Sequence, residues 1–167
     1  MMDHSQKARL LYNNMNRTPV RHFNIRVYGI IRNEKNEVLL SDEFQLGQKM
    51  TKFPGGGLKF GEGAADCIRR EAIEEFGQEI EIVEHFYTTD FFQRALFYPD
   101  HQLISIYYII RFLKPLKFKI SDKPFDFTGS ENGNQSFRWK KIKDLKPEEV
   151  SFPIDRHVVT LLKKRFS

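Results

Sequence analysis

The sequence has little cysteine, no long apolar run and no large excess of one charge. Its single cysteine, Cys67, excludes a disulfide framework and suits a reducing compartment. No apolar run approaches the length that spans a membrane, and the polar opening MMDHSQKARL is not a secretory signal. We therefore expect a cytoplasmic protein with no membrane partner.

The near balance of charge also limits the kinds of partner. With 27 basic and 22 acidic residues the net charge is +5, which favours anionic ligands but is too small and dispersed to indicate nucleic-acid binding. We interpret the lysines of residues 140–146 as a solvated face rather than a phosphate track. A hydrophobic fraction of 40% with sixteen Phe predicts a folded globule, and 167 residues fit one domain.

Hydrophobic patterning predicts a mixed α/β chain. Five segments have the alternation or apolar content of strands: 22–31, 38–41, 79–92, 103–113 and 136–140. The fourth is apolar enough to be a central strand buried on both faces. Helices are expected at 154–166 and, within a polar N-terminal extension, at 7–12. The remaining connections are predicted to be loops: 42–52, 93–102 and 114–135.

The most informative stretch is residues 53–77, FPGGGLKFGEGAADCIRREAIEEFG. Residues 63–76 are predicted to be a helix, because apolar side chains recur there near helical spacing. That apolar stripe consists of Ala65, Ile68, Ala72, Ile73 and Phe76. Gly77 follows, where a helix commonly ends in a left-handed residue.

Three carboxylates share one face of this predicted helix. Glu71, Glu74 and Glu75 stand three and four residues apart, and like charges at this spacing destabilise a helix unless a cation lies among them. Carboxylate oxygens suit Mg²⁺ or Mn²⁺, and Mg²⁺ usually keeps positions for water and phosphate oxygens. The pattern predicts a divalent metal beside a phosphate-bearing substrate. The alternative is an acidic, solvent-facing helix after a glycine turn.

The complete spacing of this stretch resembles the Nudix box, Gx5Ex7REUxEExGU with U an aliphatic residue. Its glycine and charged positions are all present: Gly56, Glu62, Arg70, Glu71, Glu74, Glu75 and Gly77. Two aliphatic positions depart from the pattern, at Ala72 and Gln78. The resemblance implies a Nudix α/β/α sandwich with a mixed β-sheet between helices, spanning residues 21–167 after the extension of residues 1–20.

The same resemblance implies a pyrophosphohydrolase that cleaves a nucleoside diphosphate linked to a group X, with Mg²⁺ or Mn²⁺ as cofactor. Glu71 would act as base or ligand, and Arg70 would orient it. Glu131 would add a carboxylate from the loop GSENGNQSFRW, with Asp126 as the alternative. The implied metal ligands are the Gly55 carbonyl, Glu62, Glu71, Glu74 and Glu75.

The stretches YPDHQLISIYYII and FPIDRHVV are similar to those of the oxidised-dGTP diphosphatases of this family. The implied substrate-binding residues are Phe53, Tyr98, His101 and Asp155. Asp155 stands where those enzymes have a purine-reading asparagine, whereas Glu43 replaces an arginine that contacts the nucleotide. We therefore expect a small soluble nucleotide, a (d)NTP or an NDP-sugar, as the substrate.

Three alternatives stay open. The chain could be an oxidised-dGTP diphosphatase, a non-catalytic nucleotide-binding module of the same fold, or an enzyme directed at RNA. A homodimer is also left open. A panel of nucleotides assayed with product identification separates these functions.

Overall fold

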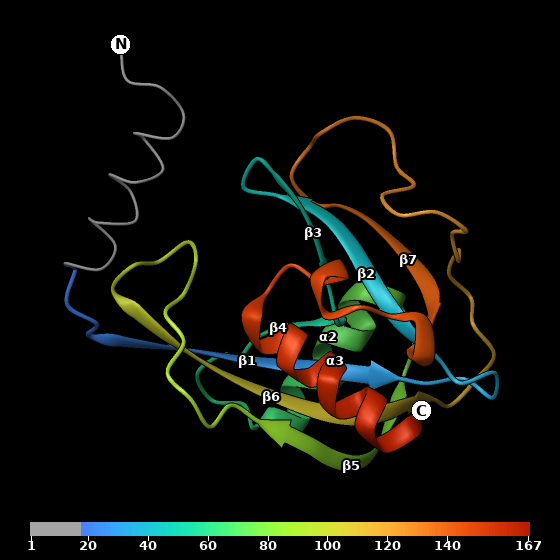
Figure 1. The fold of residues 1–167 in the computed structure, drawn as a ribbon, viewed down its shortest axis with the longest axis horizontal. Helices are drawn as coiled ribbons and strands as arrows, with labels where there is room; N and C mark the ends of the chain where they lie inside the picture. Colours follow the sequence, from blue (N-terminus) through green and yellow to red (C-terminus); the bar gives the residue numbers. More distant parts are fainter. Residues whose placement is uncertain (1–17) are drawn as a thin grey trace.

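The computed structural model describes residues 18–167, and the helix expected at residues 7–12 lies outside them. Two sheets lie between two long helices (Figure 1). The first sheet has the order β4-β1-β6-β5 and comprises β1 (His22–Ile31), β4 (Gly55–Gly57), β5 (Ile80–Thr88) and β6 (His101–Phe112). The second has the order β3-β2-β7 and comprises β2 (Glu37–Gln45), β3 (Gln48–Lys52) and β7 (Asn134–Lys141).

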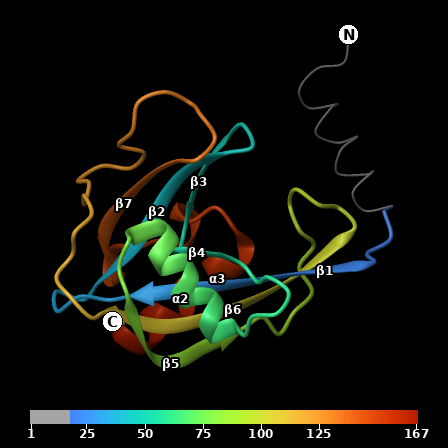
Figure 2. The same ribbon diagram turned by 180° about the vertical axis from the view of Figure 1, so that it is seen from behind.

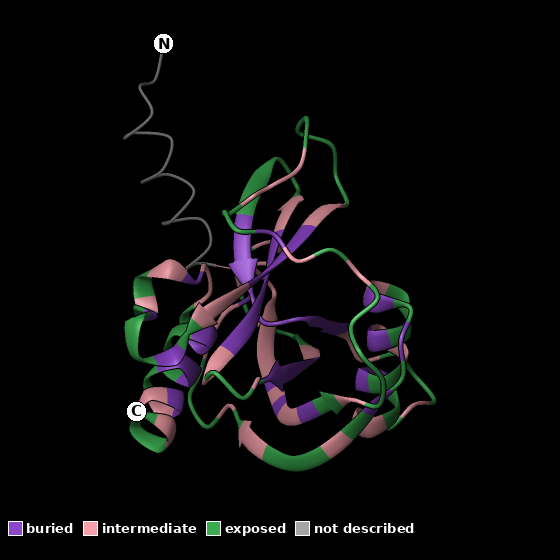
Figure 3. Ribbon diagram, turned by 90° about the vertical axis from the view of Figure 1, so that its right-hand side faces the viewer, coloured by how far each residue is buried: buried purple, intermediate pink, exposed green. Residues whose placement is uncertain are grey.

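The helices are α2 (Ala64–Phe76) and α3 (Pro153–Phe166), and they cover opposite faces of the sheets (Figures 1 and 2). Two short 3₁₀ turns precede α3, at Ile142–Asp144 and Pro147–Glu149. Buried residues lie on the sheet-facing sides of both helices and exposed residues on their outer sides (Figure 3). The predicted α/β/α sandwich is confirmed. Among the described residues no helix is long and apolar enough to cross a membrane.

Strand β6 is the central strand that the apolar run 103–113 predicted. It pairs in parallel with β1 along its length, from His22↔His101 to Ile31↔Ile110, and in antiparallel with β5. Its alternate side chains reach two hydrophobic clusters, Tyr107 in the cluster under α3 and Ile110 in the cluster under α2. The strand is therefore packed on both faces, as expected.

Helix α2 begins and ends at the predicted glycines. Gly63 is extended at its N-cap, and Gly77 has a left-handed φ of 63° and donates its N–H to the Ile73 carbonyl. Ile68 and Phe76 are buried against the sheets, but Ile73 is 49% exposed, so its predicted burial is wrong. Residues 68, 72 and 76 already form the stripe that faces the sheets, and Ile73 is turned by about 100° from Ala72.

The loop predicted at 42–52 is wrong, because residues 37–52 form a β2–β3 hairpin. Its two-residue turn, Leu46 and Gly47, has positive φ at both positions, 51° and 76°. Asp42 is fully buried on β2, where it accepts hydrogen bonds from Thr51 Oγ1 (2.6 Å) and Arg138 Nε (2.6 Å). A polar residue in the strand interior hides the alternation that would have predicted it.

Candidate active site

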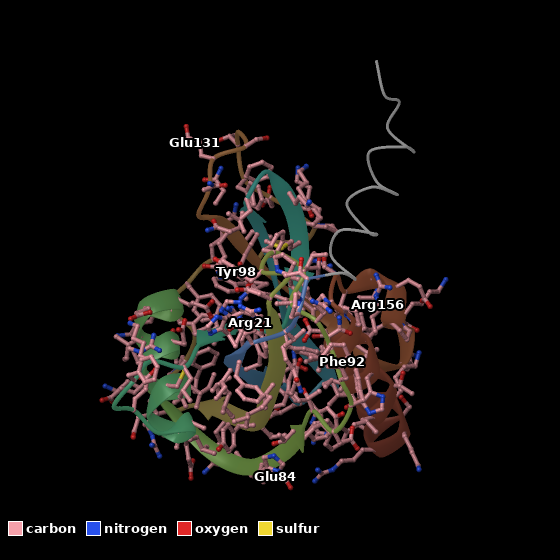
Figure 4. The ribbon with its side chains drawn as sticks, turned by 90° about the vertical axis from the view of Figure 1, so that its left-hand side faces the viewer. Arg21, Glu84, Phe92, Tyr98, Glu131 and Arg156 are labelled. Carbon is pink, nitrogen blue, oxygen red and sulfur yellow. The ribbon has the colours of Figure 1, made fainter. Side chains whose placement is uncertain are left out.

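A cleft of about 670 Å³ opens between the two helices on one edge of the sheets. Its wall comes from β1, β3, the glycine turn, α2, β6, β7 and the start of α3, and includes Arg26, Tyr28, Lys52, Glu71, Glu75 and Asp155. Tyr98, from the loop before β6, lies between the helices in the view of Figure 4. The box therefore faces a cavity large enough for a nucleotide.

The glycine turn places the box carboxylates against the central sheet. Strand β4 pairs with β1 through Val27↔Gly56 and Tyr28↔Gly55. A Cβ built on Gly56 would lie 2.3 Å from Glu71 Oε1, so the Glu71 carboxylate rests directly on this backbone. Gly55 donates its N–H to Glu75 Oε2 at 3.1 Å. Two predicted metal ligands thus converge on Gly55 and Gly56.

Arg70 organises the other carboxylates of the box. Its guanidinium donates to Glu62 (2.6 and 3.0 Å), to Glu71 Oε1 (2.7 Å) and to Glu74 Oε2 (3.1 Å). The hydrogen bonds from Arg70 lower the pKa of Glu62 to about 2. Arg70 therefore holds Glu71 beside Gly56, and its orienting role in catalysis stays a prediction.

A buried ion pair that the sequence reasoning missed completes the floor of the cleft. Lys52 Nζ lies 2.9 Å from the Gly55 carbonyl, 3.0 Å from Glu43 Oε1 and 3.9 Å from Glu75 Oε1. Burial opposes the charge of Lys52, but Glu43 and Glu75 raise its pKa above the ordinary value. In the sequence, Lys52 stands three residues before Gly55, an expected metal ligand, and this proximity could have indicated that Lys52 belongs to the site.

Glu75 is the box carboxylate whose pKa is raised. Burial, with added repulsion from Glu43 and Glu71, raises its pKa to about 7, against the opposing effects of Lys52 and Gln135. The Gln135 amide donates to Glu43 Oε1 (3.0 Å) and to Glu75 Oε1 (3.3 Å). A nearby cation would therefore stabilise the ionised form of the Glu75 carboxylate.

The donor set suits a hard divalent cation, because it consists of carboxylate and carbonyl oxygens that converge on Gly55 and Gly56. Glu71 and the half-exposed Glu74 would hold the ion on the outer side of the box, whereas the Gly55 carbonyl and Glu75 already lie next to Lys52. Among residues 18–167, however, no three His, Cys, Asp or Glu side chains already form a metal site. Arg70 and Lys52 are the basic side chains next to these carboxylates.

Asp155 forms part of the cleft wall, as its predicted substrate role requires. It is 1% exposed, and the Tyr107 hydroxyl donates to its Oδ1 at 2.5 Å. Its Oδ2 is buried without a hydrogen-bond partner among the described residues. Burial raises the pKa of Asp155 to about 6. A ligand group could still satisfy this oxygen.

Tyr98 and His101 lie further out. Tyr98 is 52% exposed and borders both the main cleft and a second depression of about 260 Å³. His101 lines only the second depression, where its Nδ1 lies 2.7 Å from Asp100 Oδ1. The structure therefore separates His101 from the carboxylates of the box.

Phe53 and Glu131 are also outside the lining of the main cleft. Phe53 is fully buried in the core, where its ring packs edge-on against Tyr107. Glu131 is exposed at the far tip of the loop before β7 (Figure 4). Asp126 pairs with Lys119 at 3.0 Å and does not line the cleft. The polar residue that reaches Glu75 from this side is Gln135.

The fold is an α/β/α sandwich in which two glutamates pack on a glycine turn beside a nucleotide-sized cleft. This is the architecture of a phosphoanhydride hydrolase. The family model of the NUDIX domain matches residues 22–162, and the chain belongs to this family. The predicted membership and the prediction of a Nudix hydrolase are confirmed. Members act on nucleoside diphosphate-linked compounds and generally use divalent metals.

Similar solved structures support the fold. A NUDIX hydrolase from Nitrosomonas europaea shares 16% identity over 86% of this chain and 89% of its own, with a TM-score of 0.60. MutT from Methanosarcina mazei Go1 shares 21% over 89% and 96%, with a TM-score of 0.59. A UDP-X diphosphatase shares 16% over 100% and 74%, with a TM-score of 0.56. A comparison with curated proteins found no match.

Proposed function

We propose that this chain hydrolyses the pyrophosphate bond of a small soluble nucleotide, a (d)NTP or an NDP-sugar, with Mg²⁺ or Mn²⁺ as cofactor. The observation that carries the proposal is the packing of Glu71 and Glu75 on the Gly55–Gly56 backbone at the floor of the cleft. Residues 21–167 would form the catalytic domain.

The floor of the cleft is suited to the phosphates. Bound there, the metal would neutralise phosphate oxygens and lower the pKa of an attacking water. Glu71 is held at the Gly56 backbone by Arg70, so its free oxygen can accept a proton from that water. Arg26 and Lys52 add positive charge to the wall of the cleft.

Other residues of the cleft wall are suited to the base or sugar. They include Phe97 and Tyr98, together with the carboxylate of Asp155 and the buried rings of Tyr28 and Tyr107. Aromatic rings offer stacking surfaces, and the partnerless Asp155 Oδ2 can accept from an exocyclic amine or a ring N–H. A purine nucleotide presents both chemistries.

Glu43 argues against a narrow oxidised-dGTP activity. Its Oε1 accepts hydrogen bonds from Ser41 Oγ at 2.8 Å and Gln135 Nε2 at 3.0 Å, besides its contact with Lys52. An acceptor held by three donors cannot replace the donor that an arginine would offer at this position.

A substrate panel tests the proposal. We expect turnover of GTP, dGTP, GDP-mannose or ADP-ribose, with products that show cleavage of the pyrophosphate. A preference for oxidised dGTP of a hundredfold or more, about 2.7 kcal/mol of discrimination, would overturn the proposed range. Binding of these nucleotides without any turnover would establish the non-catalytic module instead.

A further inference from the structure

The basic side chain of Lys52 lies beside Gly55 and Glu75, which we call the inner side of the box. Glu71 and Glu74 form its outer side. Lys52 is the last residue of β3, and its side chain is 7% exposed. Its ammonium contacts the Gly55 carbonyl at 2.9 Å and Glu43 at 3.0 Å, and approaches Glu75 to 3.9 Å. A carbonyl and carboxylates are also the ligands that a hard divalent ion takes.

The neighbouring ion pair shows what a purely structural arrangement looks like in this sheet. Asp42 and Glu43 are adjacent on β2, so they face opposite sides of the strand. Asp42 is fully buried, pairs with Arg138 at 2.6 Å and does not line the cleft. Glu43 and Lys52 both line the cleft, beside the glycine turn. The Glu43–Lys52 ion pair therefore belongs to the candidate active site.

We propose that the Lys52 ammonium is a built-in cation of the active site, which takes the place of one divalent ion beside Gly55 and Glu75. Divalent ions then bind on the outer side of the box, at Glu71 and Glu74, where Arg70 reaches only one oxygen of each carboxylate. A second cation at the inner position would be repelled by Lys52 and would lose the Gly55 carbonyl, which Lys52 already contacts. The inference rests on the proposed metal-dependent function.

The consequence is a change in metal stoichiometry when Lys52 loses its charge. Lys52→Met removes the ammonium and keeps a chain of similar length, so Glu43, Glu75 and the Gly55 carbonyl become free to bind a metal. We expect this variant to bind one more Mn²⁺ per chain than the wild type, or to bind Mn²⁺ at least tenfold more tightly. Lys49→Met is the matched control, because Lys49 is an exposed lysine of the same strand.

The experiment counts Mn²⁺ bound to each purified chain by electron paramagnetic resonance and calorimetry, without nucleotide and with a methylene-bridged diphosphate analogue. Unchanged Mn²⁺ stoichiometry and affinity in Lys52→Met would overturn the inference. If that variant has no cooperative melt, Lys52→Gln replaces it, since an amide carries no charge; a gain in the same direction but smaller is expected, because the amide can still donate to the Gly55 carbonyl. The readout needs no turnover, so a wild type that binds Mn²⁺ but cleaves no nucleotide refutes only the proposed function.

Discussion

Asp155 gives the protein a pH dependence that can be worked from its burial. Its carboxyl group is 1% exposed and has a pKa of about 6, against an ordinary value of 3.8. The folded state therefore holds this proton more tightly than the unfolded state. The stability that protonated Asp155 contributes is complete below about pH 4 and is lost as the pH rises through 6.

The size of the effect follows from the two pKa values. Each pH unit between them is worth about 1.4 kcal/mol, so ionised Asp155 costs the folded state about 3 kcal/mol above pH 6. Asp155→Asn is neutral at every pH and keeps the shape of the side chain. We expect the free energy of unfolding of the variant, minus that of the wild type, to rise by about 2 kcal/mol from pH 4.5 to pH 7.5.

Urea denaturation at several pH values measures this difference. Taking the difference removes the opposing contribution of other carboxylates, such as Glu62, whose pKa is lowered. Asp144→Asn, at an exposed position, sets the baseline. A difference for Asp155→Asn that stays constant across this range would show that Asp155 is already ionised without cost, and the reasoning from burial would be wrong.

Three further substitutions test the site and the packing. Gly56→Ala should displace the Glu71 carboxylate and lower turnover about a hundredfold while changing the free energy of unfolding by less than about 1 kcal/mol, since a flexible side chain can move away; normal kinetics would contradict the packing of Glu71 on Gly56. Glu131→Gln should change kcat/KM by less than about threefold, or ~0.7 kcal/mol, because Glu131 lies at the tip of its loop, and a large loss would return it to the site. Ile68→Ala should cost about 2–4 kcal/mol in denaturant unfolding, whereas Ile73→Ala should cost less than about 0.5 kcal/mol; equal losses would contradict the observed face of α2.

Local pattern was enough to predict the elements that hold the box. Helix α2 has its apolar stripe and its two glycine ends within the sequence itself, and β1 and β6 are long runs of β-branched and aromatic residues. These elements are determined by interactions between near neighbours or by burial of a whole segment. Their positions in the fold therefore agree closely with the prediction.

The parts that local pattern missed depend on partners far away in the chain. Asp42 is buried in a pair with Arg138, 96 residues later, and hydrophobic periodicity cannot predict such a pair. Gln135 reaches Glu75 from β7, whereas the resemblance had directed attention to Glu131 in the preceding loop. Polar side chains buried by long-range pairs need the folded structure to be found.

The most direct test of the account follows nucleotide hydrolysis by ³¹P nuclear magnetic resonance, for the wild type and Glu71→Gln, with Mg²⁺ and after exhaustive chelation. The account predicts that the pyrophosphate signal of a (d)NTP or NDP-sugar is lost with Mg²⁺, persists after chelation, and disappears about a hundredfold more slowly in the folded Glu71→Gln variant. Undiminished turnover without metal, or near-normal turnover in Glu71→Gln, would contradict it.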